Sequence, residues 1–254
     1  IFPLPLQAGD TIAIVATARK VGRDEMAPAI GILQQWGLQV VEGENLYADK
    51  NQYAGDDPLR AEDFQWALDN TKIKAVLFAR GGYGSVRISD RINFSEFKIN
   101  PKWLIGFSDI TTIHSHVHNQ LNVATLHAPM AINFPKTPDT VLNQIKDFLF
   151  GNSIVLHAQA HLLNRMGNAK GQLVGGNLSI LYSLTASASD IDTKGKILFL
   201  EDLDEYLYHI DRMMMQLKRC GKLHNLAGLV VGAMSEMKDN TIPFGKIAEE
   251  IIAE

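Results

Sequence analysis

The sequence contains a single cysteine, Cys220, among 254 residues. One cysteine cannot form an intramolecular disulfide framework or a cysteine-based zinc site. Basic residues are also scarce, because 24 Lys and Arg face 28 Asp and Glu and leave a net charge of −4. A chain without a basic surface is a poor partner for nucleic acid. No apolar run approaches the ~20 residues that span a bilayer, so we expect no membrane partner.

The N-terminus lacks the ordered regions of a secretory signal peptide. We therefore expect a cytoplasmic protein. The chain begins with Ile1 and not with methionine, so a signal removed before Ile1 stays open as an alternative.

The first half of the chain alternates apolar runs with helical patterns. We expect helices over 26–36, 60–68 and 110–119. We expect buried strands over 11–16, 38–41, 75–78, 103–107 and 123–126. Strands separated by helices predict a parallel sheet covered on both faces, with ligands bound beyond the carboxyl ends of its strands.

The segment Trp103–Thr111 is the most informative stretch. An apolar strand ends at Ser108-Asp109, and a helix follows at once. A serine on such a corner, followed by an amide at a helix N-terminus, is typical of a nucleophile elbow. Only half of the G-x-S-x-G pattern is present, because Ile110 stands where the second glycine would be. The alternative is that Ser108 or Asp109 merely caps the helix.

The run Arg80-Gly81-Gly82-Tyr83-Gly84 directly follows another strand, so it lies on the same edge of the sheet as Ser108. Its amides could supply a second oxyanion donor. The run matches neither common phosphate-binding glycine motif. A structural turn that needs positive φ is the alternative.

The second half of the chain begins after residue 150. We expect an α/β domain over 1–150, a linker over 151–164 and a second domain over 165–254. In the second domain, a strand over 196–200 ends at Glu201, and helices begin near Leu178 and Leu207. We expect a further strand over 228–232 and a helix over 247–254. Asp202, unlike Glu201, is expected to face solvent or to cap the next helix.

His114, His116 and His118 alternate within the helix that follows Ser108. Residues two apart point to different sides of a helix, so these histidines make no metal-binding face. We expect neither a metal nor a cofactor. His127 closes the fifth expected strand and therefore shares an edge with Ser108.

Several motifs together resemble the LD-carboxypeptidases, a family of serine peptidases that includes murein tetrapeptide carboxypeptidases and microcin C immunity hydrolases. The resemblance extends from Gly9 to the C-terminus. The segments that carry it are Ala79–Gly84, Gly106–Thr111, His127–Met130, Gly175–Leu178 and Leu198–Asp202.

The resemblance implies a flavodoxin-like N-terminal domain and a smaller β-rich C-terminal domain, usually in a homodimer. It also implies that Ser108 is the nucleophile and that Glu201 orients a catalytic histidine. The amide of Asp109 and that of Gly81 or Gly82 would form the oxyanion hole. We expect the remaining motif residues Tyr83, His127 and Asn177 to contact the substrate.

The sequence departs from the family at the histidine. The family's catalytic histidine lies in a Gly-His segment well downstream of the Glu201 motif. Here His209 and His224 follow Glu201, but neither lies in such a segment. We therefore expect the base to lie beyond residue 254. The alternative is that this chain is inactive as it stands.

The function that we expect is cleavage of an L,D peptide bond. The expected reaction is release of terminal D-alanine from murein tetrapeptide, a small peptide substrate, in cell-wall recycling. Two alternatives remain: hydrolysis of a microcin C-type peptidyl-nucleotide, and a non-catalytic domain that binds an anion through its glycine loop.

Overall fold

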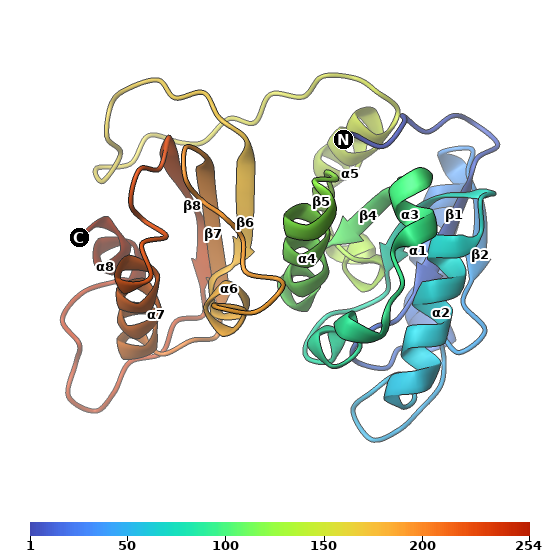
Figure 1. The fold of residues 1–254 in the computed structure, drawn as a ribbon, viewed down its shortest axis with the longest axis horizontal. Helices are drawn as coiled ribbons and strands as arrows, with labels where there is room; N and C mark the ends of the chain where they lie inside the picture. The colour runs from blue at the N-terminus through green and yellow to red at the C-terminus, as the bar shows by residue number, and fades with distance from the viewer. The chain divides into compact units, whose positions relative to one another are not determined.

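The computed structural model describes residues 1–254, which form two compact units, Ile1–Val155 and Leu156–Glu254 (Figure 1). The strands of the first unit are β1 (Thr11–Val15), β2 (Gln39–Glu42), β3 (Ile73–Phe78), β4 (Trp103–Gly106) and β5 (Leu126–His127). Its α-helices are α1 (Arg23–Gln35), α2 (Asp57–Asp69), α3 (Ser95–Ile99), α4 (Thr111–Leu121) and α5 (Asp139–Leu149). Short 3-10 helices are η1 (Ser85–Arg87), η2 (Ser89–Arg91), η3 (Ser108–Ile110) and η4 (Ala131–Lys136).

The first unit is built on one parallel sheet with the strand order β2-β1-β3-β4-β5. This is the order of flavodoxin-like folds, in which ligands bind at the carboxyl ends of the strands, near the point between β1 and β3 where the order reverses. The expected α/β class with a flavodoxin-like first domain is confirmed.

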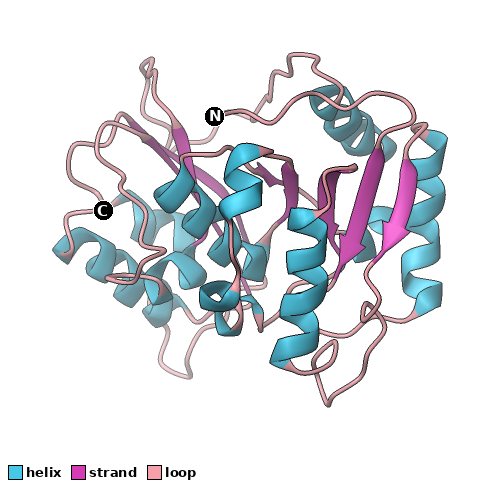
Figure 2. Ribbon diagram, turned by 45° about the vertical axis from the view of Figure 1, so that its right-hand side comes forward, coloured by secondary structure: helices cyan, strands magenta, loops and turns pink.

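Helices cover both faces of this sheet (Figure 2). Neighbouring residues of a strand point to opposite faces, so each strand packs against helices on both sides. On one face Ile12 and Ile14 of β1 pack with α1 and α5. On the other face Ala13 and Val15 pack with α2, α3 and α4. The sheet is therefore buried on both sides. Side chains that could meet a ligand must come from the loops at the ends of the strands.

The second unit contains β6 (Leu173–Asn177), α6 (Leu178–Ser183), β7 (Ile197–Leu203), α7 (Leu207–Arg219), β8 (Gly228–Ser235) and α8 (Ala248–Ala253). Its three strands are parallel in the order β6-β7-β8. All three helices contribute to one apolar cluster with Leu198 and Leu200 of β7 (Figure 1). The smaller second domain that the sequence predicts is thus present.

Two expectations for the elements need correction. The fifth strand does not span 123–126, because only Leu126 and His127 pair with β4. The residues before Leu178, which we expected only to lead into a helix, form β6. Gly175 and Gly176 weaken the sequence signal for that strand, since glycine is a poor strand former.

Candidate active site

Ser108 lies on a strained turn between β4 and α4. Its backbone φ is 59°, in the left-handed region that side chains other than glycine rarely adopt. The strand ends at Gly106, and Ser108 itself begins the 3-10 turn η3 that continues into α4. Backbone strain of this kind is held in place by surrounding structure and concentrates at functional sites. The turn has the conformation of a nucleophile elbow.

The helix-cap alternative for Ser108 and Asp109 is wrong. The residues at the N-cap positions of η3 and α4 are Phe107 and Ile110, and neither turn has a side-chain cap. The side chain of Asp109 is buried, and its Oδ2 accepts a hydrogen bond from the amide of Ser85 at 2.9 Å. Both side chains are therefore available for roles other than starting the helix.

The half-matched serine motif has a steric explanation. A Cβ at Gly106 would lie 2.9 Å from Cγ1 of Ile110, so only glycine fits at the end of β4. Ile110 fills the space that the two-glycine form of the motif leaves open, and it is fully buried in the core against α4. The turn is thus closed by one glycine and one apolar side chain.

The glycine-rich loop after β3 contacts the elbow. A Cβ at Gly81 would lie 3.5 Å from Cβ of Ser108 and 3.2 Å from Cε of Met130. At Gly82, where φ is 107°, a Cβ would meet the side chain of Arg19. The expected proximity of this loop and Ser108 is therefore present within the first unit. Gly81 therefore lies against Ser108, whereas Gly82 lies against Arg19, and an oxyanion role for either amide stays a prediction.

Tyr83 projects from the same loop. Its side chain is 44% exposed, and its ring centroid lies 6.3 Å from that of Tyr53. An exposed aromatic side chain on the loop that carries Gly81 can contact a substrate, and this role stays a prediction.

A buried histidine, His114, and a half-buried one, His127, lie close to the elbow. The rings of His114 and His127 are 6.4 Å apart, and the ring of His127 lies 6.0 Å from that of Phe107. His114 is hydrogen-bonded through Nε2 to the carbonyl oxygen of Gly106 at 2.9 Å. Burial lowers the pKa of His114 to about 4. Burial, and then the neighbouring His114, lower that of His127 to about 3. Such weakly basic imidazoles are poor general bases near neutral pH.

Glu201 lies near the carboxyl end of β7 in the second unit. In the register of the sheet it is opposite Asn177, the last residue of β6. Burial raises the pKa of Glu201 to about 7. The adjacent Asp202 adds to this rise, whereas a hydrogen bond with Asn177 opposes it. Its carboxyl group therefore titrates near neutral pH, as carboxyl groups in functional sites often do.

Asp202 differs from our expectation. It neither faces solvent nor caps the helix that follows, because it is 2% exposed and binds the start of the preceding helix, α6. Its carboxylate accepts hydrogen bonds from the amide of Ser179 at 2.8 Å and from Nδ2 of Asn177 at 2.9 Å. Asn177 in turn caps α6 through the amide of Ile180. Both side chains stabilise this turn, and substrate contact by Asn177 stays a prediction.

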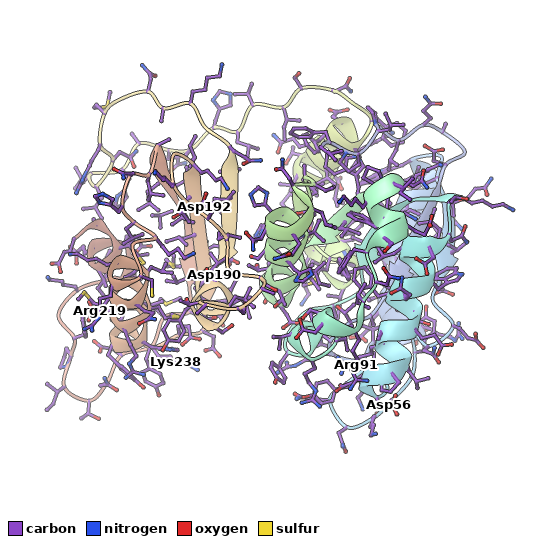
Figure 3. All side chains as sticks on the ribbon, viewed as in Figure 1. Asp56, Arg91, Asp190, Asp192, Arg219 and Lys238 are labelled. Atoms are coloured by element: carbon purple, nitrogen blue, oxygen red, sulfur yellow. The ribbon has the colours of Figure 1, made fainter.

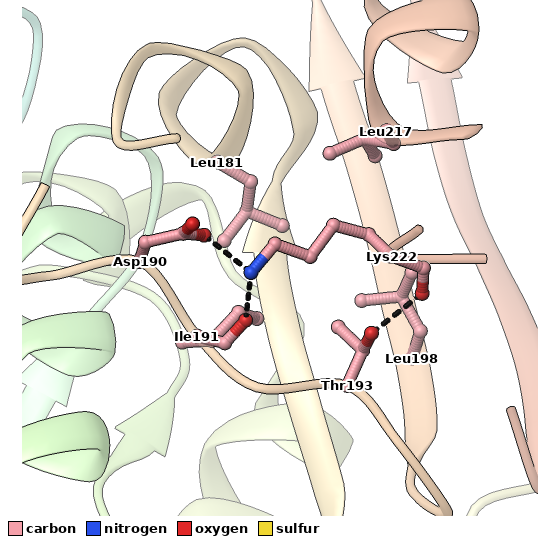
Figure 4. Close-up of a pocket in the computed structure, with 7 residues that line it drawn as sticks. All are labelled: Leu181, Asp190, Ile191, Thr193, Leu198, Leu217 and Lys222. Carbon is pink, nitrogen blue, oxygen red and sulfur yellow. Dashed lines mark hydrogen bonds and ion pairs between the residues drawn. The ribbon is translucent and has the colours of Figure 1, made fainter. Parts of the chain in front are cut away.

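Other charged groups of the second unit form structural pairs. Lys238, labelled in Figure 3, contacts Asp204 at 2.6 Å. A cavity of about 10 Å³ lies beside Lys222. Nζ of Lys222 lies 2.7 Å from Oδ1 of Asp190, as Figure 4 shows with the other lining residues. This space is no larger than a water molecule needs. Nδ1 of His209, on α7, lies 2.6 Å from Oε2 of Glu205, which precedes that helix.

The sequence reasoning missed the polar residues beneath the glycine loop. Thr17, Arg60 and Ser85 are all buried, and Arg60 donates to the carbonyl oxygen of Thr17 at 2.6 Å. A single arginine in the helix over 60–68 was their only sequence signal. No cluster of three or more His, Cys, Asp or Glu side chains is placed to hold a metal ion. None of the helices combines the length and the apolar character that crossing a bilayer requires.

Two family models match the chain. Residues 12–128 match the LD-carboxypeptidase N-terminal domain, and residues 170–254 match the LD-carboxypeptidase C-terminal domain. The first match includes the elbow and the glycine loop, and the second includes β7 and Glu201.

Named relatives agree with these matches. A probable murein peptide carboxypeptidase of Bacillus subtilis is 37% identical over 90% of this chain and 73% of its own length. The murein tetrapeptide carboxypeptidase of Pseudomonas aeruginosa is 27% identical over 89% of this chain and 76% of its own length.

Solved structures share the fold. The muramoyltetrapeptide carboxypeptidase of Oxalobacter formigenes is 26% identical, with a TM-score of 0.84 over 96% of this chain and 83% of that one. A microcin C7 self-immunity protein in complex with aspartyl sulfamoyl adenosine gives a TM-score of 0.86. That protein is 20% identical, and the match covers 98% of this chain and 84% of that one. At that identity the likeness concerns the fold alone.

Proposed function

Because the chain belongs to the LD-carboxypeptidase family, we propose that it releases the terminal D-alanine of murein tetrapeptide by nucleophilic attack of Ser108. The family and the names of two relatives support a carboxypeptidase that acts on murein peptides. The observation that carries the proposal is the strained Ser108, with its φ of 59°, placed against the glycine loop at Gly81.

In the proposed reaction, the Ser108 hydroxyl attacks the carbonyl carbon between an L-configured centre and D-alanine. The carbonyl oxygen becomes an oxyanion, which needs hydrogen-bond donors already in place. The amide of Asp109, at the start of the turn into α4, and the amide of Gly81 or Gly82 are the donors that we propose. Each such donor contributes roughly 3 kcal/mol in serine proteases.

The proposed triad is completed by Glu201 and a histidine. A serine hydroxyl is a weak nucleophile without a base to take its proton. His114 and His127 are too weakly basic for this task, with pKa values of about 4 and about 3. We propose, from the likeness to the LD-carboxypeptidase family, that the base is a histidine outside residues 1–254.

Glu201 is suited to orient that histidine. Burial opposes ionisation of its carboxyl group, whose pKa is about 7. A neighbouring imidazolium would lower that pKa and stabilise the charged pair. The imidazolium forms as Ser108 loses its proton, so Glu201 would act during acylation. The imidazolium gives its proton to the leaving amine of D-alanine as the C–N bond breaks and an acyl-enzyme forms on Ser108. The histidine then takes a proton from water, which attacks the acyl carbon, and returns a proton to Ser108 as the shortened peptide leaves.

The remaining parts of the proposal concern the protein's surroundings. Tyr83 and His127 in the first unit and Asn177 in the second are the proposed substrate contacts. We also propose that the protein acts in the cytoplasm as a homodimer, in peptidoglycan recycling.

The test is a release assay on the full-length protein with murein tetrapeptide, in which free D-alanine is measured by chromatography. The matched substrate control ends in L-alanine, and the matched enzyme control is Ser108→Ala. We expect D-alanine release by the unchanged protein and none above background by Ser108→Ala.

Other outcomes would favour the alternatives. Cleavage of aspartyl sulfamoyl adenosine but not of the tetrapeptide would favour a peptidyl-nucleotide hydrolase. Tight binding of an anion without turnover of either compound would favour a binding domain. Full activity of Ser108→Ala would remove the serine from the mechanism.

A further inference from the structure

A buried polar network joins the glycine loop to the elbow. The Asp109 side chain is 1% exposed, and its Oδ2 accepts a hydrogen bond from the amide of Ser85 at 2.9 Å. The hydroxyls of Ser85 and Thr17 are 2.8 Å apart, so the contact continues to the end of β1. Ser85 directly follows Gly84, the last glycine of the loop. Asp109, the residue after Ser108, therefore binds the end of the glycine loop at Ser85, whereas the other end, at Gly81, lies against Ser108.

Arg60, which forms its ion pair with Asp57, adds a positive charge beside this network. It is 1% exposed, and its Nη1 donates to the carbonyl oxygen of Thr17 at 2.6 Å. A Cβ at Gly84 would lie 2.4 Å from the same nitrogen, so the loop packs directly on the guanidinium group. Burial raises the pKa of Asp109, whereas the amides of Ser85 and Gly84 and the charge of Arg60 lower it. The network thus offsets part of the cost of burying the carboxylate.

The proposed reaction does not use this carboxylate. It requires only the backbone amide of Asp109, which any residue would provide. A buried charge that is paired with another is frequently replaceable by apolar side chains without loss of stability. A buried carboxylate that binds backbone amides does, however, fix the position of the segment that carries them. Here that segment begins next to Ser108, at Gly81.

We propose that the Asp109 carboxylate is a positioning residue that holds the Gly81–Gly84 loop in register with the elbow. Asp109 then sets both oxyanion donors, one through its own amide and the other through the loop that its side chain holds. This inference rests on the function proposed above. It assigns to Asp109 a side-chain role that is separate from its main-chain role.

The proposal predicts a specific kinetic defect. Asp109→Asn keeps the size of the side chain but removes the negative charge that faces Arg60 and leaves only one oxygen able to accept from the amide of Ser85. Oxyanion donors act mainly on the transition state, so kcat should fall while KM stays nearly constant. We expect a loss of about 10²-fold in kcat, comparable with removal of one oxyanion donor, and a change in KM below about threefold.

The experiment combines turnover with amide hydrogen exchange on the full-length protein. Exchange is followed by mass spectrometry in peptides that cover residues 79–87. The matched control is Asp90→Asn, which changes an exposed carboxylate just after the same loop. We expect faster exchange over 79–87 in Asp109→Asn together with the kcat defect, and neither change in Asp90→Asn.

Ser85→Ala serves as a second variant in case Asp109→Asn does not fold. It removes the Ser85 hydroxyl from the network but keeps the Ser85 amide that Asp109 binds. We expect a milder loss of about fivefold in kcat, because the loss of one hydrogen bond is worth about 1 kcal/mol. Unchanged kcat and unchanged loop exchange in the variants that fold would overturn the proposal, as would a defect confined to KM.

The failure of this inference differs from failure of the proposed function. If the unchanged protein cleaves no peptide, the proposed function is wrong, and hydrogen exchange alone decides whether Asp109 holds the loop. If the unchanged protein cleaves the peptide and Asp109→Asn cleaves it equally fast, the function stands and the positioning role is wrong.

Discussion

Asp202 accepts a hydrogen bond from the amide of Ser179 at 2.8 Å, so the carboxylate next to Glu201 stabilises the start of a helix. The two adjacent carboxylates therefore have different surroundings. Asp202 is 2% exposed and binds three donors, from Asn177, Ser179 and Leu203. The carboxyl group of Glu201, in contrast, has a pKa that burial raises to about 7.

Substitution of these two carboxylates should separate catalysis from stability. Glu201→Gln should lower kcat of the full-length protein by ~10⁴, as loss of a triad carboxylate does, without lowering the stability of the fold. Asp202→Asn should lower the free energy of unfolding by about 1–3 kcal/mol, because it leaves buried donors without an acceptor. Urea titrations and kcat measurements on the folded protein check both. Equal losses of kcat in the two variants would contradict the assignment of Glu201.

The raised pKa of Glu201 also predicts a pH-dependent stability of residues 1–254. The folded state holds this proton up to about pH 7, whereas the unfolded group has a pKa of 4.5. Between those values the folded state binds more protons, so stability falls as pH rises through this range. Glu201→Gln has no such group. It should match the unchanged chain near pH 4.5 and exceed it in urea midpoint at pH 8; a constant difference at all pH values would exclude this explanation.

His114 should have the opposite effect. Burial lowers its pKa from 6.5 to about 4, so the unfolded state binds more protons between these values, and stability is lost as pH falls below 6.5. His114→Gln keeps a donor for the carbonyl oxygen of Gly106. The variant should lose less stability between pH 7 and pH 5, by up to about 2 kcal/mol. The exposed His157→Gln is the control, and an identical acid sensitivity in His114→Gln would refute the assignment.

The strain at Ser108 predicts a stability difference between two inactive variants. At a φ of 59°, a residue with a Cβ is disfavoured by about 1 kcal/mol relative to glycine. Ser108→Gly should therefore be more stable than Ser108→Ala by about that amount, although neither can act as a nucleophile. Thermal unfolding of both variants measures the difference. A Ser108→Ala variant as stable as Ser108→Gly would mean that the turn is not strained.

The sheet of the first unit could be predicted because its central strands are nearly continuous apolar runs, as in Ile12–Val15 and Ala75–Phe78. Strands buried on both faces have this pattern. The helix α5 was missed although Leu142, Ile145 and Leu149 have helical spacing and are all buried. Charged and polar residues separate these apolar ones, as in an amphipathic helix, so no continuous apolar run marks the segment.

The parts of the candidate site that directly follow strands could be predicted from the sequence. Ser108 and Gly81 each follow a strand of one parallel sheet, so their proximity follows from the topology. The hydrogen bond between Asp109 and Ser85 was not predictable, because no spacing or motif links residues 24 positions apart. Likewise, the pKa of Glu201 depends on burial, which a sequence does not state.

The most direct test of the central claim is the site of covalent modification by a fluorophosphonate, which reacts with activated serines. The full-length protein is treated with the probe, digested, and analysed by mass spectrometry. The account predicts one adduct, on Ser108, and its loss in Ser108→Ala. An adduct on a different serine, or continued release of D-alanine by Ser108→Ala, would contradict the account.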